Sequence, residues 1–214
     1  MSKKNDPNSN VPDQCNVALL IIDVINDFEF EGGDALAQQA RRVVDNIAEL
    51  KRRAKVAGIP VVYVNDNFGK WQSDFQKLID RCIGEGVRGQ PIARGLLPEA
   101  DDYFVLKPKH SAFYSTTLDL LLRYLGAKLL ILTGMTGDNC ILFTAGDANI
   151  RDYQLMVPFD CVASETDERN RRALQILEEV VNAKIKASTE LDLQALIENT
   201  NTQHELVRGA YSAT

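Results

Sequence analysis

The chain has 214 residues, of which 45% are hydrophobic and 25% are charged, and its formal net charge is -6. This length and composition are typical of one sizeable globular domain, and they exclude a fibrous or largely disordered chain. The acidic balance argues against nucleic acid as the main partner, because phosphate binding needs a basic face. No apolar run approaches the roughly 18 residues that a membrane helix requires, so we expect no membrane association.

The ends of the chain differ in composition from the part between them. Residues 1–14 are polar and lack the apolar segment of a secretory signal, so we expect a flexible leader. Residues 15–200 form the predicted domain, and residues 201–214 form a C-terminal tail without a clear pattern. The cysteines are far apart and form no CxxC pair; they are Cys15, Cys82, Cys140 and Cys161. This spacing and the missing signal favour free thiols in a reducing cytoplasm over disulfides or a zinc site.

Short apolar runs of strand length recur along the domain. The first, Val17 to Ile22, is apolar at every position, which is typical of a central strand buried on both faces. The six predicted strands are residues 17–22, 60–64, 102–106, 128–132, 154–158 and 184–187. Each run is brief and ends in turn or polar residues, which favours a strand over a helix.

Amphipathic segments separate these runs. The predicted helices are residues 35–57, 73–83, 116–125, a segment that begins at residue 138, 168–183, and a last helix that Thr189 caps and that ends near residue 199. The glycine- and proline-rich stretch that follows the second helix, up to Pro98, is predicted to be a loop. Strands that alternate with helices predict a three-layer α/β/α fold, with a six-stranded parallel, Rossmann-like sheet covered on both faces.

The stretch from Thr133 to Ala148, TGMTGDNCILFTAGDA, leads from a predicted strand into a predicted helix. Cys140 falls in the first turn of that helix, where free backbone N–H groups and the positive end of the helix dipole stabilise an anion. A thiol in this position is expected to have a pKa below its free value of about 8.5. The pattern therefore predicts a nucleophilic cysteine, and the other three cysteines are assigned to packing or to the surface.

Two further reactive side chains follow strands of the predicted parallel sheet. Asp23 follows the first strand and Lys107 follows the third, while Cys140 follows the fourth. Ligands of such sheets bind beyond the carboxyl ends of the strands, where these residues are expected to meet. A carboxylate there can accept the thiol proton, and an ammonium group keeps the carboxylate and a thiolate charged.

Three motifs contain these residues: LLIIDVINDF with Asp23, VLKPKHSAFYSTTLDLLL with Lys107, and LTGMTGDNCILFTAGDA with Cys140. With them the chain resembles, from Val17 to Leu193, the isochorismatase-like cysteine hydrolase superfamily, which includes nicotinamidases and N-carbamoylsarcosine amidases. The resemblance implies an Asp–Lys–Cys triad and a six-stranded parallel sheet. It also implies a cis peptide bond between Met135 and Thr136, an oxyanion hole formed by the N–H groups of Thr136 and Cys140, and a homo-oligomer, either a dimer or a tetramer.

The chain departs from one branch of this superfamily. Nicotinamidases bind a metal through an Asp-x-His pair and further histidines, whereas the equivalent loop here reads Asn65-Asp66-Asn67-Phe68, and the chain has only two histidines. We therefore expect no metal and no cofactor, and nicotinamide is a doubtful substrate. Isochorismatases proper generally lack a cysteine at the nucleophile position. The expected function is therefore cleavage of a C–N bond in a small amide or ureido substrate through a thioester.

Five further residues are candidates for substrate binding. Phe28, Trp71 and Phe113 are aromatic residues that could line a pocket, although aromatic residues after strands more often belong to the core. Asp66 and Asn67 follow the second strand at the same edge, where they could bind substrate or form an Asx-turn.

Two other interpretations of Cys140 remain open. It could pair with His110 in a Cys–His dyad. Alternatively, the chain could be a non-catalytic protein that binds a small molecule or anion at Gly134, Gly137 and the following helix, with Cys140 as a redox-sensitive thiol. That interpretation gives Asp23 no reason to face the same site, because a carboxylate repels a bound anion. A dinucleotide site is not indicated, since no G-x-G-x-x-G motif follows the first strand.

Overall fold

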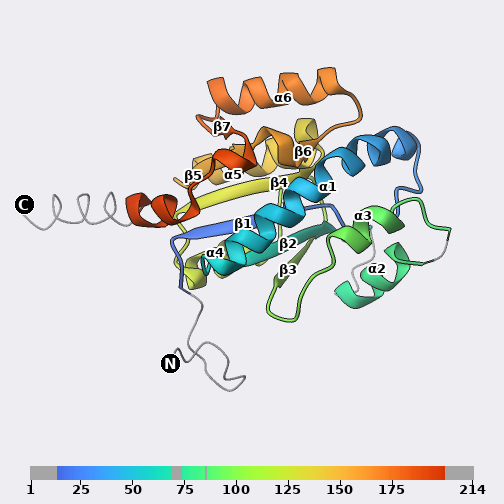
Figure 1. The fold of residues 1–214 in the computed structure, drawn as a ribbon, viewed down its shortest axis with the longest axis horizontal. Helices are drawn as coiled ribbons and strands as arrows, with labels where there is room; N and C mark the ends of the chain where they lie inside the picture. The colour runs from blue at the N-terminus through green and yellow to red at the C-terminus, as the bar shows by residue number, and fades with distance from the viewer. Residues whose placement is uncertain (1–13, 69–73, 85, 201–214) are drawn as a thin grey trace, which may run out of the picture.

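The computed structural model describes residues 14–68, 74–84 and 86–200, which form an α/β fold around one parallel sheet (Figure 1). The strands are β1 (Val17–Ile22), β2 (Val61–Asp66), β3 (Tyr103–Lys107), β4 (Leu129–Met135), β5 (Gln154–Pro158), β6 (Val162–Ala163) and β7 (Lys184–Lys186). Their order is β3-β2-β1-β4-β5-β7, and β6 pairs with the carboxyl end of β4. The chain thus winds outward in both directions from the β1–β4 pair.

The described part of the sheet has seven strands, and six of them are the predicted ones. The seventh, β6, is two residues long and pairs Val162 with Gly134 and Ala163 with Met135. A strand this short has no alternating pattern of its own, and its pairing with β4 depends on tertiary contacts. The predicted parallel arrangement is confirmed for every strand pair.

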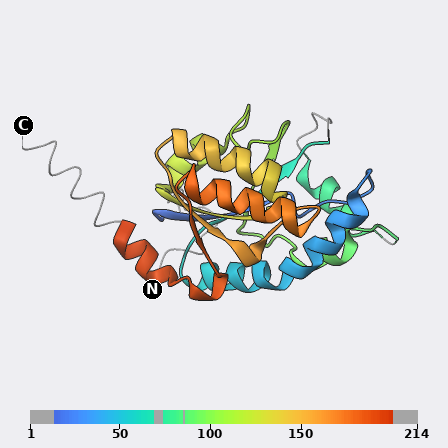
Figure 2. The same cartoon turned by 90° about the horizontal axis from the view of Figure 1, so that it is seen from above.

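Helices cover both faces of the sheet (Figure 2). They are α1 (Gly33–Val56), α2 (Phe75–Cys82), α3 (Gln90–Gly95), α4 (Leu118–Leu125), α5 (Leu142–Ile150) and α6 (Asp167–Glu179), and residues 193–200 are also helical. The core side chains of α1, α2 and α3 pack in one apolar cluster, and those of α4, α5 and α6 pack in the other. Across the described ranges, no helix combines the length and the apolar character needed to cross a membrane.

Strand β1 separates the two apolar clusters. Val17, Leu19 and Ile21 belong to the cluster on the α1 side, while the alternate residues belong to the cluster on the α5 side. Every residue of β1 is completely buried. Burial of each such side chain contributes about 1.5–3 kcal/mol, so the uninterrupted apolar run places β1 at the centre of the sheet.

Three predictions of local structure are wrong. The stretch predicted as a loop up to Pro98 contains α3, which buries Ile92 and Ala93 against α1 and has a proline in its first turn. The last helix is not capped by Thr189, which lies in a 3-10 turn; instead Asp192 Oδ1 accepts the Ala195 N–H at 3.0 Å. The segment that begins at residue 138 does not start as an α-helix, as described below. The hydrophobic pattern specifies none of the three, because α3 depends on packing against α1 and the other two depend on local hydrogen bonds.

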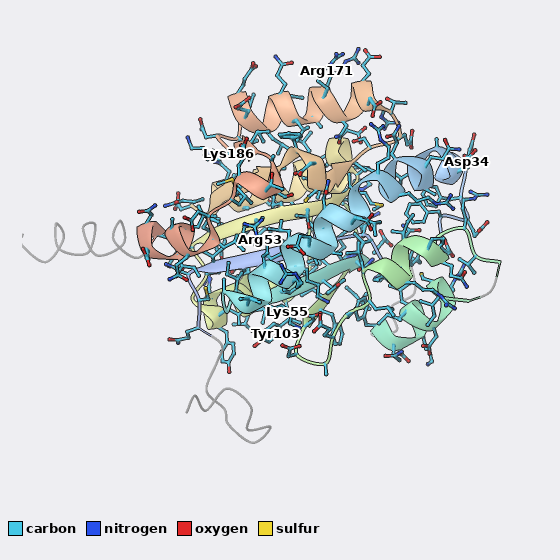
Figure 3. The ribbon with its side chains drawn as sticks, in the orientation of Figure 1. Asp34, Arg53, Lys55, Tyr103, Arg171 and Lys186 are labelled. Atoms are coloured by element: carbon cyan, nitrogen blue, oxygen red, sulfur yellow. The ribbon has the colours of Figure 1, made fainter. Side chains whose placement is uncertain are left out.

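Helix α1 contacts two distant parts of the chain through side chains that include Arg53 and Lys55, which are labelled in Figure 3. Arg53 donates hydrogen bonds to the carbonyl oxygens of Ser188 and Leu191, near the C-terminal helix. On the same helix, Lys51 pairs with the buried Asp102 at 2.7 Å, and Lys55 pairs with Asp102 at 3.1 Å. Because Asp102 directly precedes β3, these contacts fix the start of the strand that ends at Lys107.

Candidate active site

The three residues of the predicted triad meet at the carboxyl edge of the sheet. Asp23 follows β1, Lys107 ends β3, and Cys140 follows β4. Lys107 Nζ lies 2.9 Å from Asp23 Oδ2 and 3.4 Å from Cys140 Sγ. The site therefore lies where the winding of the sheet reverses between β1 and β4, the position at which open α/β sheets bind ligands.

Lys107 reaches this point across the end of β2. Strand β2 lies between β1 and β3, and Asp66 at its end is paired in register with Lys107. Two strand spacings amount to about 10 Å, so the long lysine stem must lean over β2 to bring its ammonium group to Asp23. The Lys107 side chain is completely buried. A buried lysine is tolerated only with partners, and Asp23 and the more distant Asp66 Oδ2, at 3.9 Å, supply the opposite charges.

The local backbone holds Asp23 in position. Its φ of 55° lies in the left-handed region, which is unusual for a residue other than glycine. Its backbone N–H donates to the carbonyl oxygen of Val64 at 2.8 Å, and its Oδ1 accepts the backbone N–H of Asp66 at 2.8 Å. Asp23 Oδ1 is thus bound by β2, while Oδ2 faces the lysine.

The thiol of Cys140 has a raised pKa, so the prediction of a lowered pKa is wrong. Burial and the negative charge of Asp23 raise the pKa of Cys140 to about 12, and the opposing effect of Lys107 is smaller. The effect of the helix dipole depends on local position along the chain, whereas desolvation of the thiol depends on the folded site. Burial alone would lower the pKa of Lys107, but Asp23, Cys140 and Asp66 raise it, so the ammonium form persists. At neutral pH the site therefore holds a neutral thiol beside the ammonium group of Lys107.

The segment that carries Cys140 begins as a π-helix, Gly137–Ile141, and continues as α5. The wide turn is closed by the Ile141 N–H, which donates to the carbonyl oxygen of Thr136 at 3.0 Å. The peptide bond between Met135 and Thr136 is cis. Cys140, in this π-helical turn, lies with its Sγ 3.4 Å from Lys107 Nζ.

Gly134 allows β4 to end close to β1. Its φ is +108°, and a Cβ atom at this position would lie 2.0 Å from the carbonyl oxygen of Ile22. No other residue fits here without moving the backbone of β1 beside Asp23. The glycine thus serves the close approach of two strands.

Helix α6 and the segment before it support the cysteine turn through residues that the sequence did not indicate. Arg169 Nε donates to Asp138 Oδ2 at 2.5 Å, and Ser164 Oγ accepts the Asp138 N–H at 3.3 Å. Asp138 Oδ1 is buried and has no hydrogen-bond partner among the described residues. The sequence does place an acidic residue, Asp138, two positions before Cys140. Its partner Arg169 lies much later in the chain, so the ion pair could not be predicted from that position alone.

A small cavity of about 120 Å³ is lined in part by Asp66, whose Oδ2 lies 3.9 Å from Lys107 Nζ. Asn67, Phe68, Leu78 and Arg81 are among its other lining residues. Asp66 Oδ1 also accepts the Phe68 N–H at 2.6 Å, so this carboxylate forms an Asx-type turn and lines the cavity at the same time. Asn67 is held by its backbone N–H, which donates to the carbonyl oxygen of Lys107 at 3.0 Å.

Two of the aromatic candidates, Phe28 and Phe113, are not among the residues that line this cavity. Phe28 is completely buried in the core on the α1 side. Phe113 is buried on the other side, where its ring faces Tyr153 and the guanidinium of Arg151. Trp71 lies outside the described residues. The rings of Phe28 and Phe113 therefore contribute to core packing, where burial of their apolar surface stabilises the fold most.

His110 is exposed, and its ring packs beside that of Phe143 at a centroid distance of 5.6 Å. The group that contacts the thiol is the Lys107 ammonium, so the geometry gives no support to a Cys–His dyad. Within the described ranges, no group of three or more histidine, cysteine, aspartate or glutamate side chains is placed to hold a metal ion.

Comparison with known proteins agrees with this geometry. The Isochorismatase domain model matches residues 17–188. The uncharacterized isochorismatase family protein YaaI of Bacillus subtilis is 42% identical over 174 residues, which cover 81% of this chain and 95% of the relative. Among solved structures, N-carbamoylsarcosine amidase from Thermoplasma acidophilum has a TM-score of 0.63 and 29% identity, covering 83% of this chain and 99% of that one. Nicotinamidase PncA from Bacillus subtilis has a TM-score of 0.63 and 27% identity, with coverages of 80% and 99%. The chain therefore belongs to the isochorismatase family of hydrolases.

Proposed function

We propose that the protein is a cysteine hydrolase that cleaves a C–N bond of a small amide or ureido substrate through a thioester. The observation that carries the proposal is the position of Lys107 Nζ between Asp23 Oδ2 and Cys140 Sγ. A buried ammonium group between a carboxylate and a thiol matches the needs of a nucleophile that is activated only when substrate is bound. The amidase and nicotinamidase among the structural relatives support C–N cleavage.

Acylation begins with the neutral thiol. Asp23 accepts the Cys140 proton as the sulfur attacks the substrate carbonyl, since the raised pKa of the thiol leaves little thiolate beforehand. The N–H groups of Thr136 and Cys140 bind the developing oxyanion, and each such donor is typically worth about 3–4 kcal/mol in the barrier. Asp23 then gives its proton to the leaving nitrogen, the C–N bond breaks, and the acyl group stays on the sulfur.

Deacylation uses the same carboxylate. Asp23, again ionised, removes a proton from water, and the resulting hydroxide attacks the thioester carbon. The C–S bond breaks, the acid leaves, and the proton returns from Asp23 to the sulfur. Lys107 remains protonated throughout and stabilises whichever neighbouring group is negative. Over the full cycle one water molecule is consumed, every proton that Asp23 accepts is passed on, and no electrons are transferred.

The test is a panel of small amides and ureido acids assayed for ammonia release. We expect turnover by the unaltered chain, a thioester on Cys140 in mass spectra of the acid-quenched enzyme, and no turnover by Cys140→Ala. Cys15→Ala is the matched control, because Cys15 lies at the opposite, amino edge of the sheet before β1. Activity retained in Cys140→Ala would refute covalent catalysis.

A further inference from the structure

The segment that follows Lys107 lies against the helix that follows Cys140. Residues 108–117 join β3 to α4 through turns and bends, and Ser111 and Ala112 within them are buried. Strands β3 and β4 are separated by β2 and β1, so no direct pairing of their ends sets the distance between the lysine and the cysteine. Contacts between residues 108–117 and α5 are the more direct connection.

Two hydrogen bonds make this connection. Thr144 Oγ1 accepts the backbone N–H of Ala112 at 3.0 Å, and Ser111 Oγ donates to Asp147 Oδ2. Thr144 and Asp147 are three residues apart, so they lie on the same face of α5. We call these two hydrogen bonds the clasp. The clasp joins the segment after the lysine to the first two turns of the helix after the cysteine.

The members of the clasp are themselves held in place. Thr144 is completely buried, and its oxygen supplies the acceptor that a buried backbone N–H needs. Ser111 Oγ also accepts the Phe113 N–H at 3.1 Å, so this hydroxyl group has two partners. Asp147 Oδ1 pairs with Arg151 at 3.0 Å, while its Oδ2 faces the serine. The clasp is therefore a fixed contact between two ordered parts of the chain.

The contact between Lys107 and Cys140 is sensitive to where α5 begins. The lysine nitrogen is fixed on one side by Asp23 Oδ2 at 2.9 Å, and the sulfur lies 3.4 Å from it. The position of the sulfur follows the turn at the start of α5. A shift of that turn by about 1 Å would lengthen the contact and change the direction of attack on a substrate.

We propose that Thr144, together with Ser111 and Asp147, positions the start of α5 so that the Cys140 thiol stays in contact with the Lys107 ammonium. The inference rests on the proposed function and adds positioning residues to the same site. The alternative role of Thr144 is packing alone, since a buried threonine also fills space. The two roles make opposite demands, because positioning needs the hydroxyl oxygen and packing needs the β-branched shape.

Two substitutions of one residue separate these roles. Thr144→Val keeps the shape and removes the acceptor, whereas Thr144→Ser keeps the acceptor and removes a methyl group. In Thr144→Val we expect kcat for ammonia release to fall by about 10- to 100-fold with KM nearly unchanged, the cost of misplacing a reacting group by about 1 Å. Thr144→Ser should retain most of the kcat of the unaltered chain. Full activity in Thr144→Val, or an equal loss in Thr144→Ser, would overturn the inference.

Alkylation of Cys140 by iodoacetamide tests the contact without any substrate. The Lys107 ammonium stabilises the thiolate, so a longer contact raises the pKa of the thiol further and slows alkylation at a fixed, mildly alkaline pH, about tenfold for each pKa unit. We expect slower labelling in Thr144→Val, counted by peptide mass spectrometry, and ordinary labelling in Thr144→Ser. This result would support the inference even if no amide in the panel were hydrolysed.

The other two results of the labelling experiment would overturn the inference. Faster labelling of Cys140 in Thr144→Val would show that the threonine shields the sulfur from the reagent. Unchanged labelling would show that the contact with the ammonium group does not depend on the threonine hydroxyl.

Thr200→Val is the matched control. Thr200 is also buried, and its hydroxyl donates to the Leu196 carbonyl oxygen at 2.7 Å. It lies in the C-terminal helix, where the Ile197 carbonyl oxygen accepts from Asn16 just before β1, at the opposite edge of the sheet. Turnover and labelling in Thr200→Val should match those of the unaltered chain.

Ser111→Ala provides a second test, which also serves if Thr144→Val does not fold. It removes the other hydrogen bond of the clasp, so we expect a smaller loss of kcat and slower labelling of Cys140. Circular dichroism of each variant checks that the chain is folded at the assay temperature. Unaltered kcat and labelling in folded Ser111→Ala would overturn the clasp as proposed.

Discussion

Lys107 and Asp23 come from strands that are separated by β2, yet Lys107 Nζ lies 2.9 Å from Asp23 Oδ2. Both side chains are almost or completely shielded from water, so each charge depends on the other. The same ammonium group contacts the sulfur of Cys140. The stability of the sheet edge and the chemistry of the thiol are therefore linked through one lysine.

Removing this lysine should cost stability as well as activity. Lys107→Met leaves the carboxylate of Asp23 buried without its cation, so we expect the free energy of unfolding to fall by about 3–5 kcal/mol. Neutralising the carboxylate as well, in Asp23→Asn/Lys107→Met, should restore most of this loss. Urea unfolding of the unaltered chain and of the two variants at neutral pH measures both effects. A double variant no more stable than Lys107→Met would show that the charge pair is not the cause.

The reactivity of Cys140 should respond to the charge of Asp23. Because burial and Asp23 raise the pKa of Cys140 to about 12, alkylation by iodoacetamide should keep rising with pH, with no plateau near the ordinary thiol value of about 8.5. Asp23→Asn removes a negative charge, so the pKa of the thiol falls and alkylation near neutral pH becomes faster, while turnover is lost with the base. Slower alkylation in this variant would contradict the proposed charge arrangement.

The raised thiol pKa also has a consequence for stability. The folded state holds the Cys140 proton more tightly than the unfolded state does, so this group's contribution is fully present below the unfolded-state pKa. It is lost as the pH rises through the folded-state value of about 12. In Cys140→Ala, the unfolding free energy should therefore decline less steeply in alkali than in the unaltered chain.

Two glycine substitutions should have opposite effects. Gly134→Ala places a methyl group 2.0 Å from the Ile22 carbonyl oxygen at a positive φ, and should lower the unfolding free energy by about 2–4 kcal/mol. Gly146 lies within α5 with no heavy atom near its missing Cβ, so Gly146→Ala should stabilise the protein by about 0.5–1 kcal/mol. Thermal unfolding of both proteins is the measurement, and a neutral Gly134→Ala would contradict the close strand approach.

The ion pair between α6 and the cysteine turn should affect the chemical step more than binding. Arg169→Gln removes the partner of Asp138, two residues before the proposed nucleophile Cys140. A displacement of about 1 Å in a nucleophile can cost up to about 100-fold in rate, so we expect kcat to fall by about 10- to 100-fold with KM nearly unchanged. Arg172→Gln, which breaks an exposed pair with Glu168 on the same helix, is the control and should be close to the unaltered enzyme. A change confined to KM would point to substrate contact instead.

Much of the fold could be predicted from the sequence because the hydrophobic pattern and the sheet are coupled. A run that is apolar at every position, such as 17–22, is stable only between two helical layers, and parallel strands bring their carboxyl ends to one edge. The positions of Asp23 and Cys140 at that edge followed from this rule. The contact made by Lys107 did not, since it depends on the strand order and on how far a side chain leans over β2.

The features that sequence missed depend on tertiary structure. Strand β6 and helix α3 are too short to show a period, and packing against β4 and α1 decides their conformation. The pKa of Cys140 was predicted with the wrong sign because the local dipole was counted and burial was not. Phe28 was considered for the pocket because it follows a strand, but its ring is in the core.

The complete enclosure of the Lys107 side chain also makes it a reporter of conformation. Reagents that acylate amines need a free, accessible nitrogen, and the folded chain offers them its surface lysines but not this one. Acyl groups found at position 107 would therefore come only from molecules that had opened. Peptide mapping after brief exposure to such a reagent would count those molecules, without any substrate in hand.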